Sequence, residues 1–126
     1  TIPCYDEEID HKNDPVKGSI SEHLVIARFM SLGYQVFRNT AACGIDMLIR
    51  ESNGTTYAVE VKTLSVMGHY LRMGVPNHQW EASDIVVGVN GQDLYSWPHL
   101  IGFLPLEKVD NKKALTQVGF IAGRIM

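Results

Sequence analysis

The chain has 126 residues, of which 45% are hydrophobic and 20% are charged, and its net charge is −3 at pH 7. This composition is typical of one soluble globular domain and excludes collagen-like, low-complexity and extensively disordered chains. No apolar run approaches the roughly 18 residues of a transmembrane helix, so we expect no contact with a membrane. The negative net charge argues against a protein that coats nucleic acid through overall charge.

The N-terminal segment, residues 1–17, is polar and contains an acidic cluster. We interpret it as a loosely held arm in front of a single domain over residues 18–126. The chain shows no signal-peptide pattern. It begins with Thr1 rather than Met, so we expect a chain that has been trimmed, processed or excised from something longer. Cys4 and Cys43 match neither a zinc spacing nor a disulfide framework, so we expect a reducing, cytoplasmic (intracellular) location.

The first predicted element is a helix that begins near residue 18. Ser19 is a suitable N-cap, and Glu22 follows three residues later, which is the pattern of a capping box. Apolar residues then recur at helical spacing as far as Leu32. Gly33 stands where a glycine commonly ends a helix, so the helix is expected to stop there.

Three strands are expected after this helix, over residues 34–38, 45–50 and 56–62. The last two flank Asn53-Gly54, which is a strong short-range signal for a hairpin. The next segment, residues 63–77, contains two glycines and a proline and shows no clear period. We therefore expect a loop with one helical turn there.

The remaining elements are a short helix over 78–83, a buried strand over 84–90, and a helical turn over 106–110. Further strand character is found over 93–98, 101–106 and 117–126. Helices and strands thus alternate in the order of one helix, three strands, a helix and more strands. This order predicts an α/β fold with a mixed central sheet flanked by helices.

The predicted hairpin carries charged residues that buried strands rarely contain. With the loop centred on Asn53, residues whose numbers sum to 106 lie opposite each other, so Asp46 pairs with Glu60. Lys62 shares the face of Glu60 because side chains alternate along a strand. Two close carboxylates repel each other unless a cation lies between them, and Mg²⁺ prefers one or two carboxylates with water and phosphate. The trio therefore suits metal-dependent hydrolysis of a phosphodiester.

These residues resemble a known family. Asp46, thirteen intervening residues and Glu60-Val61-Lys62 look like the PD-(D/E)XK signature of restriction-endonuclease-like nucleases, although Ile45 stands in place of the Pro. The upstream sequence KGSISEHLVIARFMSLGYQVFRN is similar to the first helix and strand of archaeal Holliday junction resolvases. It is also similar to the PD-(D/E)XK homing endonucleases of group I introns. The resemblance covers residues 17–63, extends loosely to about residue 90, and implies an αβββαβ core.

The resemblance also implies an activity and a set of site residues. It implies a Mg²⁺-dependent endodeoxyribonuclease, with Mn²⁺ as a substitute, that acts on double-stranded or branched DNA. Asp46 and Glu60 would bind the metal, Lys62 would assist the attacking water, and Glu22 matches a glutamate that helps to bind metal in those relatives. Gln79 matches a polar residue that faces the metal from the second helix in some of them. A homodimer or homotetramer is implied, because duplex cleavage needs two nicks and each protomer has one site.

Candidate contacts to nucleic acid are few and scattered along the chain. Loops placed on a rigid sheet commonly carry recognition, so residues 63–77 are the expected specificity element, with Tyr70 and Arg72 as contacts. Other candidate phosphate contacts are Lys12, Lys17, Arg38 and Arg50. Several such contacts, if they converge, would make binding depend on salt.

Two alternative functions stay open at this point. A nuclease toxin domain that acts on DNA or RNA would suit the acidic N-terminal segment and the absence of an initial Met. A non-catalytic nucleic-acid-binding module would keep the fold and bind without hydrolysis. Simpler structural roles are also open for single residues: Glu22 would close a capping box, Asp46 would bond to the backbone, and Lys62 would discourage edge pairing.

Overall fold

The computed structural model describes residues 14–38, 45–109 and 116–124. The order of its elements is α1 (Asp14–Ser31), β1 (Gln35–Arg38), β2 (Met47–Arg50), β3 (Thr56–Thr63), β4 (Ser65–Met67), β5 (Tyr70–Pro76), α2 (Asn77–Ala82), β6 (Ile85–Asn90), β7 (Asp93–Trp97), β8 (Leu104–Pro105), β9 (Glu107–Val109) and β10 (Gln117–Arg124). The predicted αβββαβ order is confirmed, with one additional hairpin between β3 and α2.

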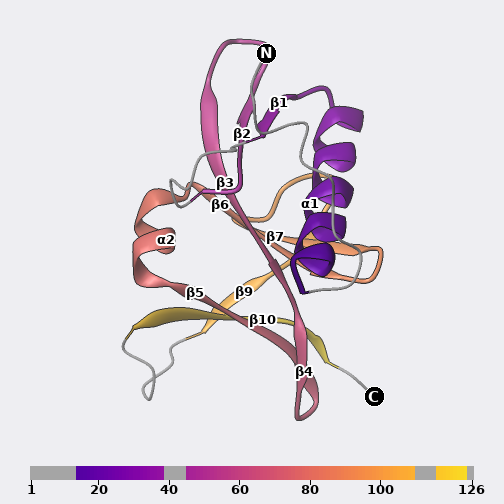
Figure 1. The fold of residues 1–126 in the computed structure, drawn as a ribbon, viewed down its shortest axis with the longest axis vertical. Helices are drawn as coiled ribbons and strands as arrows, with labels where there is room; N and C mark the ends of the chain where they lie inside the picture. The colour runs from indigo at the N-terminus through magenta and orange to yellow at the C-terminus, as the bar shows by residue number, and fades with distance from the viewer. Residues whose placement is uncertain (1–13, 39–44, 110–115, 125–126) are drawn as a thin grey trace.

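Two sheets form the body of the molecule (Figure 1). The central sheet has the order β1-β2-β3-β6-β7-β8, and it is mixed because β3 pairs with β2 antiparallel and with β6 parallel. The second sheet, β4-β5-β10-β9, crosses the bottom of Figure 1. Helix α1 lies to the right of the central sheet and α2 to the left. In the part of the chain that the structure describes, no helix combines the length and apolar character needed to span a bilayer.

The central sheet separates two hydrophobic cores. One core packs α1 against the sheet and includes Val25, Phe29, Val59, Val61 and Val87. The other fills the space between the central sheet, the second sheet and α2, and it includes Leu71, Val75, Val86, Trp80 and Phe120. Alternation along the strands produces this division, because neighbouring residues such as Val86 and Val87 point to opposite faces.

Helix α1 begins earlier than predicted. The expected N-cap was Ser19, but the helix already starts at Asp14, so the predicted capping box with Glu22 is wrong. Pro15 explains the earlier start, because proline is tolerated in the first turn, where backbone N–H groups have no intrahelical acceptor. The expected arm stays a prediction for residues 1–13, which lie outside the described residues.

Strands β2 and β3 form the predicted hairpin in the predicted register. Met47 is paired with Val59 and Arg50 with Thr56, so the numbers of paired residues sum to 106. The turn includes Gly54, whose φ of 93° lies in the region that favours glycine. A slip of one residue would move every side chain of β3 to the opposite face.

Strands β4 and β5 replace the loop and helical turn expected over residues 63–77. Met67 is paired with Tyr70, which leaves Gly68 and His69 as a two-residue turn. Gly68 has a φ of 64°, and glycine at the first turn position is typical of a type II′ hairpin. The prediction was wrong because the apolar residues of this segment do not alternate cleanly, which hid the strands on either side of the turn.

Strand β9 replaces the helical turn expected over residues 106–110. Its pairing partner is β10, which is distant in sequence, and strand formation depends strongly on such cross-strand neighbours. The predicted strands over 84–90, 93–98 and 117–126 are confirmed as β6, β7 and β10, and the helix over 78–83 is confirmed as α2. The strand expected over 101–106 is reduced to β8.

Replacement of Phe29 tests the packing of α1 on the central sheet. Phe29 is fully buried, and its ring centroid lies 5.5 Å from that of Tyr34 and 5.0 Å from that of Phe103. We expect Phe29→Ala to lower the free energy of unfolding by about 3–5 kcal/mol, because it leaves a cavity in the core. Phe37, which is 41% exposed, offers a matched control, and Phe37→Ala should cost about 1 kcal/mol or less. Urea denaturation measures both values, and equal losses of unfolding free energy in the two variants would contradict this packing.

Candidate active site

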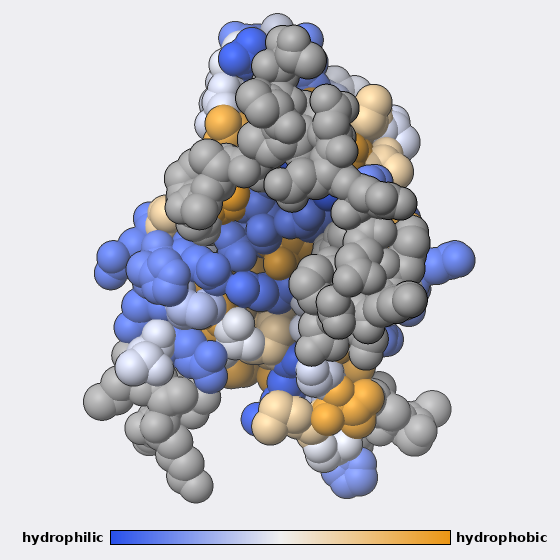
Figure 2. Space-filling model, viewed as in Figure 1, coloured by the Kyte–Doolittle hydropathy of each residue, from blue (hydrophilic) through white to orange (hydrophobic). Residues whose placement is uncertain are grey.

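Three elements bring the predicted catalytic residues together. Asp46 lies immediately before β2, Glu60 and Lys62 lie on β3, and Glu22 lies on α1. A hydrogen bond of 3.1 Å between the hydroxyl groups of Ser21 and Thr63 joins this part of α1 to the end of β3. Hydrophilic residues gather across the middle of the face shown in Figure 2, over α2 and the neighbouring part of the central sheet.

Backbone hydrogen bonds hold Asp46 against β3. The amide of Val61 donates to Asp46 Oδ2 at 2.7 Å, and the amide of Asp46 donates to the carbonyl oxygen of Val59 at 3.2 Å. The Asp46 carboxylate is therefore fixed beside Glu60, the residue between these two valines. Its bond to the backbone, considered above as a purely structural role, also orients it toward the other carboxylates.

Glu60 carries a deeply buried carboxyl group. Its residue is 2% exposed, and its Oε1 lies 3.4 Å from the Lys62 Nζ. Its Oε2 has no hydrogen-bond partner among the described residues. Burial, followed by the neighbouring Asp46 carboxylate, raises the pKa of Glu60 from 4.5 to about 8, and Lys62 offsets part of this rise. A buried polar atom without a partner is costly unless it is protonated or meets a ligand.

Glu22 connects the site to β1. The Arg38 Nη2 donates to Glu22 Oε2 at 3.3 Å, and both side chains are about a quarter exposed. Burial and the nearby Asp46 carboxylate raise the pKa of Glu22, whereas the Arg38 guanidinium lowers it. Arg38, predicted as a contact to DNA, is thus an ion-pair partner of a candidate metal ligand.

The carboxylates fit a cation that needs few protein ligands. Within the described residues, no three His, Cys, Asp or Glu side chains converge into a ready-made metal site. Asp46 is close to both Glu22 and Glu60, so neighbouring pairs of carboxylates are present. A cation would satisfy the partnerless oxygen of Glu60. Mg²⁺ suits such a site because it is usually bound by one or two carboxylates and completes its shell with water and phosphate.

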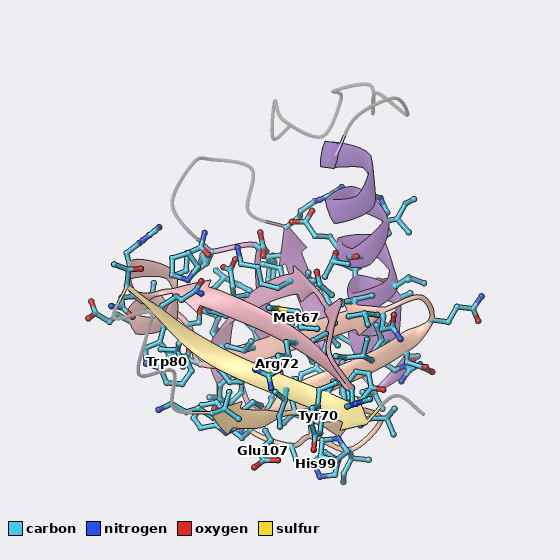
Figure 3. The ribbon with its side chains drawn as sticks, turned by 90° about the horizontal axis from the view of Figure 1, so that it is seen from below. Met67, Tyr70, Arg72, Trp80, His99 and Glu107 are labelled. Carbon is cyan, nitrogen blue, oxygen red and sulfur yellow. The ribbon has the colours of Figure 1, made fainter. Side chains whose placement is uncertain are left out.

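The other predicted residues lie on separate elements. Gln79 is on α2, and its Oε1 is a second buried oxygen without a partner among the described residues. Tyr70 and Arg72 are neighbours on β5 in Figure 3, and the Arg72 guanidinium carbon lies 5.8 Å from the centroid of the Tyr70 ring. Lys17 belongs to α1, Arg50 packs on the Phe37 ring, and Lys12 lies outside the described residues. Their roles toward nucleic acid stay predictions.

The structure has a cavity beside Lys62 that the sequence analysis did not predict. It has a volume of about 530 Å³ and is lined by residues of β3, β4, β5, β9 and β10. Gln117 and Ser65 line it but belong to strands that are far apart in sequence. The pairing of β5 with both β4 and β10 brings them together, and no local sequence pattern indicates that pairing.

Comparisons with known proteins concern the fold. No protein-family model matches the sequence, and no curated protein matches it significantly. One similar solved structure is that of a bacterial homing endonuclease, I-Ssp6803I, with a TM-score of 0.58 and 18% sequence identity. The match covers 67% of this chain and 64% of that protein, so the chain spans just under two thirds of its length. At this identity the likeness shows a shared α/β fold, which agrees with the predicted fold class.

Replacement of Glu60 by glutamine tests the buried carboxyl group. Between pH 4.5 and 8 the unfolded chain has released this proton and the folded chain retains it, so the stability of the metal-free protein falls as the pH rises. Glu60→Gln has no such proton. We therefore expect the free energy of unfolding of the variant, minus that of wild type, to increase by about 1.4 kcal/mol for each pH unit in this window. Urea denaturation in EDTA at pH 5.5 and 7.5 measures the difference, and parallel pH profiles would contradict it.

Proposed function

We propose that this protein is a metal-dependent endonuclease that hydrolyses phosphodiester bonds in DNA. The observation that carries the proposal is the buried Glu60 carboxyl group, which lies against Asp46 and Lys62 and keeps one oxygen without a partner. Strongly perturbed pKa values with a specific charge partner concentrate at functional sites. The fold shared with a homing endonuclease adds support from an independent direction.

The roles of the side chains follow from their positions. Asp46 and Glu60 would hold Mg²⁺, or Mn²⁺ in its place, and Glu22 would extend this set. The bound ion would polarise a phosphoryl oxygen and lower the pKa of a water molecule. The Lys62 ammonium, next to Glu60, would donate a hydrogen bond to the attacking water or stabilise the negative charge that develops on phosphorus.

Asp46 would enter the reaction already oriented, because the amide of Val61 holds its carboxylate. A group fixed in this way loses little conformational freedom when substrate arrives, which lowers the barrier of the chemical step.

We also propose a homodimer or homotetramer, since one site per chain cuts one strand. Tyr70, Arg72, Arg38 and Lys17 are proposed contacts to DNA, and Gln79 is proposed to act beside the metal ligands.

Removal of the Asp46 carboxylate tests the metal site without requiring a substrate. We expect the wild-type protein to bind Mg²⁺ or Mn²⁺ measurably in titration calorimetry at pH 8. Asp46→Asn should weaken this binding at least tenfold, because an amide oxygen carries no net charge to balance a divalent cation. Glu81→Gln, on the exposed part of α2, provides a control and should bind like wild type. Equal binding by both variants would contradict a metal site at Asp46.

Replacement of Lys62 tests catalysis. Linear duplex, four-way junction, single-stranded DNA and tRNA are each offered with Mg²⁺ or Mn²⁺ at low salt. We expect Lys62→Ala to cut at least about a hundredfold more slowly than wild type, because it loses a group that stabilises developing charge. Lys108→Ala is the control, since Lys108 lies on β9 of the second sheet, where its ammonium packs over the Trp80 ring of α2 and does not contact Glu60.

The same experiment distinguishes the other functions. Cleavage of tRNA in preference to every DNA would favour a nuclease toxin domain. Binding of DNA that is unchanged in Lys62→Ala, together with no cleavage of any substrate, would overturn the proposal in favour of a non-catalytic binding module. Cleavage that persists in EDTA would overturn the dependence on a metal.

A further inference from the structure

The cavity beside Lys62 extends the candidate site onto the second sheet. Its volume of about 530 Å³ lies within the range of about 300–1,000 Å³ that is usual for ligand pockets. Lys62 and Thr63, at the end of β3, form one wall. After Leu64 the chain continues directly into β4, which also lines the cavity. The candidate active site and the cavity are therefore built on one continuous stretch of backbone.

Two glycines form part of the floor of this cavity. Gly74 of β5 and Gly119 of β10 are paired directly across the strands, so two adjacent positions lack side chains. A glycine inside a strand commonly marks a place where another molecule approaches the backbone closely. The side chain of Gln117 lies over Gly74, because a Cβ atom there would come within 2.4 Å of Gln117 Oε1. Gly74 therefore provides the space in which the Gln117 amide is held.

The described lining of the cavity is mixed, with cationic and polar groups beside five apolar side chains, which are those of Met67, Met73, Val109, Phe120 and Ile121. Lys62 and Arg72 supply positive charge, and none of the described lining residues is Asp or Glu. Hydroxyl and amide groups come from Thr63, Ser65 and Gln117. Glu107 is on the same face of the sheet, paired with Ile121, but it lines a separate cavity with Trp97 and Lys108.

This local charge stands out in a chain whose net charge is −3. A cleft lined by one sign of charge concentrates ligands of the opposite sign. A phosphodiester chain that leaves Lys62 would carry its next negative charge into this cleft. The Arg72 guanidinium also packs over the Tyr70 ring, which steadies it at the rim.

We infer that this glycine-floored groove, formed by Lys62, Ser65, Arg72, Gly74, Gln117 and Gly119, holds the nucleotide next to the scissile phosphate. The inference rests on the proposed nuclease function. Arg72 pairs with the phosphate, because a guanidinium matches phosphate geometry in a bidentate manner. Gln117 reads the base edge, since its amide both donates and accepts hydrogen bonds. Gly74 positions that amide, so Gln117 and Gly74 determine specificity together.

The test uses a pool of DNA duplexes with a randomised centre. Binding in EDTA is measured against salt concentration, and products of cleavage with Mg²⁺ are sequenced. Arg72→Ala should weaken binding to all duplexes and reduce the slope of log K against log salt by about one. Gln117→Ala and Gly74→Ala should keep that slope and relax the preference at the same single position. Gly123→Ala is the matched control, because its Cβ would meet its nearest neighbour at 4.0 Å.

The outcomes separate this inference from the proposed function. Agreement between Gly74→Ala and Gln117→Ala, with Gly123→Ala like wild type, supports the groove as a specificity site. If the wild type cleaves DNA and the variants keep its salt slope and sequence preference, the proposed role of the groove is overturned. The nuclease proposal is then left intact. An effect of Arg72→Ala alone overturns the base-reading role of Gln117. A wild type that neither binds nor cleaves DNA overturns both.

Discussion

The antiparallel pairing of β2 with β3 determines where the charged groups of the candidate site lie. It sets Asp46 beside β3 and sends Val59 and Val61 into the core under α1, so Glu60 and Lys62 must point to the opposite face. A slip by one residue would move Lys62 to the face under the helix and move both valines to the opposite face. The burial of the valines therefore fixes the positions of the carboxylate and the ammonium, and folding and site geometry share one constraint.

Glu60 shows how stability and chemistry oppose each other within this constraint. An ionised carboxylate at this depth, next to Asp46, is unfavourable, and one ion pair with Lys62 compensates only in part. A proton and a divalent cation are alternative ways to relieve the same repulsion. In the proposed metal site, the Glu60 carboxyl group would therefore hold either a proton or a divalent cation. A hydrophobic residue of the same volume at position 60 would stabilise the fold, but it would remove the group that can take up a proton or a cation.

Local signals in the sequence sufficed for the hairpin and for much of the fold. Asn53-Gly54 set the register, and the alternation of β3 identified the face of Glu60. The helix start was misplaced because Ser19 offered a plausible cap while Pro15 marked the earlier beginning. The second sheet was missed, since β5 gains its neighbour β10 from the far end of the chain. The ion pair between Glu22 and Arg38 was not predicted either, because tertiary packing brings the two residues together and no sequence spacing indicates it.

The two faces of the second sheet have different roles in the structure. Leu71, Val75 and Phe120 point inward and hold the sheet to the core, whereas Arg72, Gly74 and Gln117 alternate with them and point outward. Residues on the outward face can therefore be exchanged during evolution without disturbing the packing beneath them. The hairpin that carries the proposed catalytic residues lies on a different sheet and is not altered by such exchanges. A lineage built on this architecture could therefore change the proposed recognition surface while keeping the proposed catalytic residues.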